Sequence, residues 1–267
     1  MPAPIYVDRV ERVSIDHPNL RGGLVGADVS VWRTPVGFEC FASFGGRIYH
    51  GVSADGRWLV LDRYPVIASG ARPSVAVWRD QFYVFYHDEE APLHQSPRLA
   101  HGMDRHSFVS VQLEISGIPR NEKAANFSVI QRNENWLLFF ELTRAHTARI
   151  AYADSHEPAG PWIMRDVLSL ADQPRKGDCA TVVPSALVAS GNILLFYSAL
   201  GSRSSQIGCA RVVGETLRVE DNAFIGAPRS LKSVSVTCAL QWGTHIYAYA
   251  RGQAETCRIT CSAPPLV

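Results

Sequence analysis

Residues 74–86 read SVAVWRDQFYVFY, and this stretch decides the fold. It opens on a hydroxyl residue, Ser74, in a short apolar run, and the polar pair Arg79 and Asp80 separates that run from a very aromatic one. Two such runs on either side of a polar turn predict a β-hairpin. The aromatic residue Tyr86 follows Ser74 by 12 residues.

The same pairing of a hydroxyl residue with an aromatic recurs along the chain. The aromatic runs cover residues 38–44, 82–88, 136–142, 193–199 and 245–251, and one aromatic register in them holds Phe41, Tyr86, Phe140, Tyr197 and Tyr249. The matching hydroxyl residues are Ser30, Ser74, Ser128, Ser185 and Thr237. Consecutive aromatics of this register lie 45–57 residues apart. That spacing is typical of propeller blades with four strands each.

The repeats predict an all-β fold, a five-bladed β-propeller formed as a single domain by residues 1–267. The last repeat is short, whereas residues 5–15 read as a strand ahead of the first repeat. We therefore expect the N-terminal strand to close the ring as the outer strand of the last blade. A closed ring leaves few exposed strand edges, which favours a monomer. A β-sandwich is the alternative, but it needs no common aromatic register.

Charge and hydropathy exclude several partners. The 26 basic and 25 acidic residues give a formal net charge of +1, and no long run of one sign occurs. We therefore expect neither nucleic acid nor an anionic membrane as a partner. No segment approaches the roughly 20 apolar residues of a membrane span. Residues 1–20 lack the basic and apolar regions of a secretory signal, so the expected compartment is the cytoplasm.

Cysteine and histidine usage indicates neither a metal site nor a cofactor. The six cysteines lack C-x-x-C spacing and lie mostly in apolar runs, so we expect reduced core thiols. A disulfide between Cys238 and Cys257 or Cys261 is the alternative. The nine histidines show no ligand spacing such as H-E-x-x-H. We expect His94, His101 and His106 at the surface and residues 87–90 in a solvated loop, with metal binding by His87 and its acidic neighbours as the alternative.

Two segments carry a resemblance to a known family. The pair ARPSV (71–75) and QFYVFY (81–86) is similar to a strand pair of the family-43 arabinanases and xylosidases. The segments RIAYADS (149–155) and EPAGPW (157–162) resemble the third strand of that family and the turn after it. The resemblance, which extends to levansucrases and invertases, implies a propeller that holds a carbohydrate or small-molecule ligand in its central funnel.

The resemblance also implies where catalytic carboxylates belong. The family uses a base, an acid and a third carboxylate that tunes the acid, and two carboxyl groups are the minimum for general acid/base hydrolysis. Its base lies in an Ala-Asp-Pro-Ser-like motif, which Ala27-Asp28-Val29-Ser30 matches at Asp28. The tuning position falls at Asn126, and the acid position falls at Val182 or Val183. Arg72 stands where levansucrases have an aspartate. The resemblance thus implies non-standard acid/base residues.

Strand geometry adds further candidates at the mouth of the funnel. Alternate residues of a strand share a face, so the residues two before each shared hydroxyl should project together. These are Asp28, Arg72, Asn126, Val183 and Ser235. The ends of the second strands, and the loops after them, should lie at the same mouth. They add His87, Asp88, Glu89, Glu141, Arg144, Ser198 and Arg251, with Asp178 nearby.

The candidates divide into two roles. We expect catalysis from Asp28 with Glu141 or Asp178. Ligand binding is expected from Arg72, Asn126, His87, Asp88, Arg144, Ser235 and Arg251. Among these, the Arg72 guanidinium is suited to a carboxylate or phosphate group on the ligand.

Three functions remain open at this stage. The first is an enzyme acting on a glycoside or a sugar-like small molecule. The second is a non-catalytic propeller that binds a sugar or another ligand, and the third is a recruited cyclase, isomerase or dehydratase. Asp28 could also serve only to pair with Arg72 and hold the ring together. A second carboxylate near Asp28 favours the enzyme, whereas a ring without one favours the binding protein.

Overall fold

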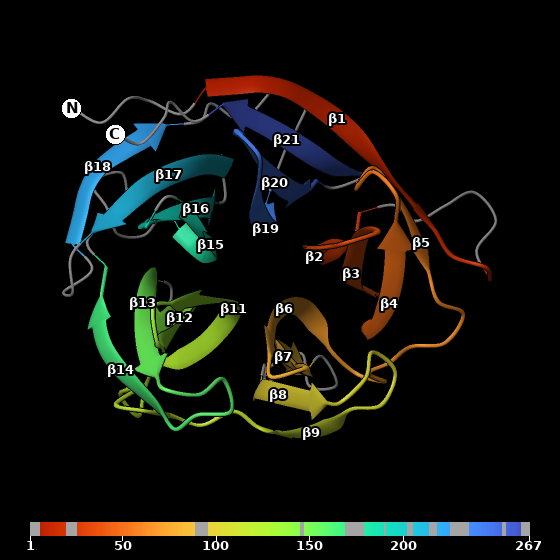
Figure 1. Ribbon diagram of the computed structural model, residues 1–267. Helices are drawn as coiled ribbons and strands as arrows, with labels where there is room; N and C mark the ends of the chain where they lie inside the picture. The colour runs from red at the N-terminus through yellow and green to blue at the C-terminus, as the bar shows by residue number, and fades with distance from the viewer. Residues whose placement is uncertain are drawn as a thin grey trace.

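The computed structural model describes residues 6–19, 26–88, 96–144, 147–168, 179–189, 191–201, 205–213, 218–224, 235–252 and 255–262. These residues form 21 strands and no helix, which confirms the all-β prediction. The strands are arranged as a ring around a central axis (Figure 1). Within the described ranges, no helix has the length and apolarity needed to cross a bilayer.

Antiparallel groups of strands make up the ring. The first is β2 (Asp28–Thr34), β3 (Gly37–Phe44), β4 (Arg47–Ser53) and β5 (Trp58–Leu61), and the second is β6 (Ala71–Trp78), β7 (Gln81–Asp88), β8 (Ser96–Gly102) and β9 (Val109–Gln112). The third is β11 (Lys123–Arg132), β12 (Asn135–Arg144), β13 (Thr147–Ser155) and β14 (Trp162–Val167), with the short β10 (Ile115–Ser116) added in parallel. The fourth is β15 (Cys179–Ala189), β16 (Asn192–Gly201), β17 (Ser205–Val213) and β18 (Arg218–Phe224), and the last is β19 (Ser235–Trp242), β20 (His245–Arg251) and β21 (Thr256–Ser262).

The N-terminal strand β1 (Tyr6–Asp16) joins the last group to the first. It pairs antiparallel with β21, where Val10 lies opposite Ile259, and it pairs in parallel with β5, where Ser14 lies opposite Trp58. The result is one eight-stranded sheet in the order β19-β20-β21-β1-β5-β4-β3-β2. Figure 1 shows β1 running along the outside of β21 toward β5. The expected closure by the N-terminal strand is therefore present.

The shared hydroxyl residues connect one inner strand to the next. The strands β2, β6, β11, β15 and β19 contact one another in a closed cycle around the axis. Side-chain hydroxyls accept hydrogen bonds from backbone N–H groups across this cycle, from Val129 to Ser74, from Ala186 to Ser128 and from Val29 to Thr237, at 3.0, 2.8 and 3.3 Å. The hydroxyl register of the sequence thus has a physical cause, because it satisfies buried backbone donors between neighbouring strand groups.

The aromatic register fills the space between neighbouring groups. Each of the five clusters of buried hydrophobic side chains among the described residues combines two adjacent groups. Phe41 of β3 and Tyr86 of β7, for example, belong to the same cluster. All five register aromatics are at most 3% exposed. The repeated aromatic therefore stabilises the contact between neighbouring strand groups.

The cysteines whose side chains are described are free thiols, and four of the five are buried. Cys238, Cys257 and Cys261 are all free, so the alternative disulfide of Cys238 with Cys257 or Cys261 is not formed. Burial raises the pKa of both Cys238 and Cys257 to about 11. Such thiols are protonated at neutral pH and poorly nucleophilic. The side chain of Cys179 lies outside the described part of the chain.

Candidate functional site

Asp28 is the first residue of β2 and carries a buried carboxylate, 1% exposed. Its Oδ2 accepts a hydrogen bond from Nη1 of Arg251, the last residue of β20, at 2.6 Å. The Nε of Arg72 on β6 lies 3.8 Å from the same oxygen. Oδ1 has no hydrogen-bond partner among the described residues. Asp28 is thus held between two guanidinium groups, while one of its oxygens can still accept a proton.

Arg72 links Asp28 to a second carboxyl group on the neighbouring strand group. Its Nη1 donates to Oδ1 of Asn126 at 2.6 Å, and Nδ2 of Asn126 donates to Oε2 of Glu141. Glu141 is 4% exposed, and its Oε1 accepts from the Thr143 hydroxyl at 2.8 Å. Thr143 was not among the predicted site residues, although its position two residues after Glu141 on one strand is the signal for a shared face. We call Arg251, Asp28, Arg72, Asn126 and Glu141 the funnel cluster.

Two irregularities in the inner strands aim Arg72 and Asn126. The pairing register shifts just before Ser74 in β6 and just before Ser128 in β11. Arg72 and Asn126 have φ angles of 53° and 52°, in a region that residues other than glycine rarely adopt. Bulges re-aim side chains, and backbone strain of this kind gathers at functional sites. The sequence analysis expected regular strand alternation to bring Arg72 and Asn126 together. In the structure, bulges bring the two side chains together instead.

The two carboxyl groups of the funnel cluster lie in contrasting surroundings. Burial raises the pKa of the Glu141 carboxyl above its ordinary value, against the opposing hydrogen bonds from Thr143 and Asn126 and the charge of Arg72. A carboxyl group with a raised pKa keeps its proton to higher pH and can act as an acid. Asp28, in contrast, faces two cations. Paired carboxyl groups in unlike environments are typical of acid/base sites.

His87, near the end of β7, adds a neutral imidazole beside the cluster. It is 2% exposed and pairs across the strands with Ala71, next to Arg72. Burial, followed by the charge of Arg72, lowers the pKa of His87 to about 4. Its Nδ1 has no hydrogen-bond partner among the described residues. At neutral pH the uncharged ring can therefore form one hydrogen bond to a ligand through Nδ1.

His87→Gln is expected to reduce the loss of stability in mild acid. An unfolded histidine takes up its proton near pH 6.5, whereas His87 in the folded protein does so near pH 4. Between these values the unfolded state binds more protons, so the free energy of unfolding falls as the pH falls. The full shift corresponds to about 3 kcal/mol.

Urea unfolding between about pH 7 and about pH 4 measures this effect. The substitution His156→Gln at an exposed histidine of the third strand group is the matched control. We expect His156→Gln to follow the wild-type pH dependence and His87→Gln to show a shallower one. Equal slopes for all three proteins would contradict the assignment.

Two further predicted site residues differ from the cluster residues in their contacts or exposure. Asp88 follows His87 on β7 and accepts a hydrogen bond from the Ser69 hydroxyl at 2.5 Å. Arg144 is exposed at the end of β12, three residues after Glu141. Adjacent residues of a strand, and residues an odd number apart, face opposite sides of the sheet. Neither Asp88 nor Arg144 therefore shares the face of its predicted companion.

The remaining candidates divide into buried and undescribed residues. Ser235 begins β19 opposite Arg251, is 4% exposed, and its hydroxyl has no hydrogen-bond partner within the described ranges. Val183 of β15 is buried and lies opposite Ser198. The predicted residues Asp178 and Glu89 lie outside the described residues. Glu141 is therefore the second carboxyl group that the described structure brings together with Asp28.

Solved structures of known proteins share this architecture. No protein-family model matches the sequence, and no curated protein matches it. Among solved structures, β-1,2-mannobiose phosphorylase from Listeria innocua is similar at a TM-score of 0.71 and 12% identity, with 92% of each chain covered. A thermostable family-43 glycoside hydrolase is similar at a TM-score of 0.66 and 14% identity, covering 94% of this chain and 98% of its own.

A third similar structure is an exo-1,5-α-L-arabinanase from a bovine ruminal metagenomic library. Its TM-score is 0.65 at 11% identity, with 88% of this chain and 92% of that chain covered. At identities this low the likeness shows the fold alone. The chain therefore has the β-propeller fold of the family-43-type glycoside hydrolases, as the sequence resemblance implied.

Proposed function

We propose that the protein is an enzyme acting on a glycoside or a sugar-like small molecule bound at the funnel cluster. The observation that carries the proposal is Glu141, a buried carboxyl group whose pKa is raised by burial. Hydrogen bonds through Asn126 connect it to Arg72, which forms an ion pair with Asp28. A non-catalytic binding site has no need of a second buried carboxyl group, which is costly to place.

Cleavage of a glycosidic bond assigns a separate role to each carboxyl group. Glu141 donates its proton to the oxygen of the departing group as the bond from that oxygen to the anomeric carbon breaks. Asp28, through its unpartnered Oδ1, accepts the proton of the attacking water or holds a sugar hydroxyl. Glu141 thus takes the role that the family resemblance assigns to position 182 or 183, where this chain has valine.

Arg72 and Arg251 favour a ligand or co-substrate with a negative charge. Their guanidinium groups share a single carboxylate oxygen of Asp28. The two positive charges therefore exceed the one negative charge of Asp28 by one. Guanidinium groups bind carboxylates and phosphates through paired hydrogen bonds. A uronic acid, a sugar phosphate or inorganic phosphate would satisfy this excess. Phosphate as the attacking group would correspond to the reaction class named for the mannobiose phosphorylase of similar fold.

Arg72→Ala is expected to weaken binding of a sugar phosphate or uronic acid at least about tenfold, and binding of the matched neutral sugar much less. The control is Arg144→Ala, which removes an exposed arginine at the end of β12. Titration calorimetry of both variants with charged and neutral ligands measures the difference. Equal loss for both ligands, or an equal effect of Arg144→Ala, would contradict an anion site at Arg72.

Two general features belong to the same proposal. We infer a five-bladed propeller, because five inner strands form the closed cycle and the eight-stranded sheet divides into two four-stranded halves at β1. We also infer a cytoplasmic monomer. Support for this comes from the free thiols and from the pairing of both edges of β1.

A further inference from the structure

We propose that His50, Asp62 and His106 form a binding site for one divalent metal ion of the zinc class. The three residues come from separate parts of the chain: His50 from β4, Asp62 from the residue after β5, and His106 from the connection between β8 and β9. None of these elements carries a residue of the funnel cluster. The proposed metal site therefore stands independently of the proposed function.

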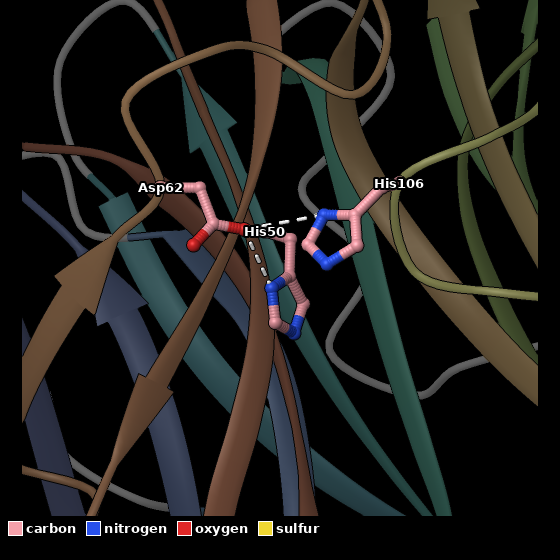
Figure 2. A group of neighbouring side chains, drawn as sticks. All are labelled: His50, Asp62 and His106. Carbon is pink, nitrogen blue, oxygen red and sulfur yellow. Dashed lines mark hydrogen bonds and ion pairs between the residues drawn. The ribbon is translucent and has the colours of Figure 1, made fainter.

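The ligand atoms already converge. Nδ1 of His50 lies 2.8 Å from Oδ2 of Asp62, and Nδ1 of His106 lies 3.6 Å from the same oxygen. All three ligand atoms fall within 4.8 Å of one another. Figure 2 shows both imidazole rings turned toward one Asp62 oxygen. A tetrahedral zinc ion with bonds of about 2.0–2.1 Å needs ligand atoms roughly 3.3 Å apart. Shifts on the order of 1 Å or less would produce this arrangement.

The choice of metal follows from the ligand types. Two imidazole nitrogens and one carboxylate oxygen suit zinc and related transition metals, whereas calcium and magnesium prefer oxygen ligands alone. Asp62 is half-buried and His106 is exposed, so the site is open to solvent on one side. Water can supply the fourth ligand there, as is usual for zinc held by three side chains. Zinc at Nδ1 would displace the proton that His50 shares with Asp62, and the neutral ring would then carry its proton on Nε2.

An unsatisfied buried atom gives a second, independent indication. His50 is 4% exposed, and its Nε2 has no hydrogen-bond partner in the part of the chain that the structure describes. The atom lies 3.7 Å from Oε2 of Glu39, which is too long for a hydrogen bond. Histidine ligands of metals almost always direct their second ring nitrogen to a carboxylate or carbonyl. A small rotation of His50 upon metal binding would bring Nε2–H to Glu39 and give Nε2 the partner that it lacks, beside the bond that Glu39 accepts from Arg105.

The backbone supports the same geometry. The N–H of Asp62 donates to the carbonyl of His50 at 2.8 Å, which fixes these two residues side by side. The N–H of His106 donates to Oδ1 of Asp104 at 2.7 Å, which shapes the turn that carries the second imidazole. Arg105 in that turn donates to Glu39, so one carboxylate orients the turn and faces His50. A bound ion would connect the β8–β9 turn of the second strand group to the outer strands of the first.

The test measures metal binding directly rather than activity. The metal-free protein is titrated with zinc chloride by calorimetry, and with cobalt(II), whose visible absorption reports tetrahedral coordination. We expect one zinc ion per chain and no comparable binding of magnesium. His106→Ala is expected to weaken zinc binding by at least about 100-fold, and Glu39→Gln by about 10–100-fold, as for an outer partner of a metal ligand. His156→Ala, at an exposed histidine away from the site, should bind zinc as wild type does.

His106 and Asp62 are at least partly exposed, so their substitution should leave the fold intact, and thermal unfolding checks this. Asp62→Asn provides a second ligand variant, and it should also lose the rise in melting temperature that zinc gives to wild type. Absence of stoichiometric zinc binding by wild type would overturn the proposal. Equal affinity of wild type, His106→Ala and Asp62→Asn would also overturn it.

Discussion

Glu141→Gln is expected to lower kcat by about 10²–10⁴-fold and leave the folded structure intact. Glutamine has the same shape, and its oxygen can accept the hydrogen bond from Asn126 while its amide group donates to the Thr143 hydroxyl, but it has no acidic proton to give. The control is Glu134→Gln in the exposed turn between β11 and β12. It makes the same chemical change within the same hairpin, and we expect turnover like that of wild type.

The pH dependence separates catalysis from a purely structural role of Glu141. Because burial raises the pKa of Glu141, the wild-type rate should persist to higher pH than the ordinary value allows and then decline as the carboxyl group loses its proton. Glu141→Gln should lack this decline in its residual rate. The assays are run with and without inorganic phosphate, which distinguishes phosphorolysis from hydrolysis. Full turnover in Glu141→Gln would exclude Glu141 as the proton donor.

Asp28→Asn is expected to reduce turnover by a similar 10²–10⁴-fold, because it removes the carboxylate whose free oxygen accepts a proton or a sugar hydroxyl. It also leaves Arg72 and Arg251 without their shared anion. The two arginine side chains are 25% and 44% exposed, so solvent limits the cost. We expect the free energy of unfolding to fall by about 1–3 kcal/mol, less than for a fully buried pair.

Asp80→Asn is the control for Asp28→Asn. Asp80 is exposed in the turn between β6 and β7 with a φ of 61°, which asparagine tolerates. Steady-state kinetics and urea unfolding are measured together on both variants. Loss of stability with unchanged kcat would assign Asp28 to holding the ring together, and the catalytic role would then be wrong.

The fold could be predicted from the sequence because its repeats have direct physical causes. Ser74, Ser128 and Thr237 recur in one register since their hydroxyls bind the backbone of the next inner strand. The aromatics recur because they fill the space between strand groups. The aromatics are buried in all five groups and the hydroxyl bonds recur in three of them, so both constraints leave a periodic mark in the sequence.

The site could be predicted only in part. Asp28 and Arg72 followed from the register, but the bulge at Arg72 changes how its side chain is aimed and leaves no pattern in a single sequence. Strand alternation places Asp88 and Arg144 on the faces opposite to His87 and Glu141, since each lies an odd number of residues from its companion. The burial that raises the pKa of Glu141 depends on packing by distant strands. His50, Asp62 and His106 come from three separate segments, so no ligand spacing marked them.

The position of β1 has a consequence for how the chain is made. During synthesis β1 and β5 emerge early and can pair, but the other edge of β1 has no partner until β21 has left the ribosome. For most of translation the nascent chain therefore carries an open strand edge, the kind of surface at which chains associate wrongly. Ring closure joins residues about 250 positions apart, and contacts at such separations form slowly. This edge of β1 is thus covered when β21 has been synthesised and pairs with it.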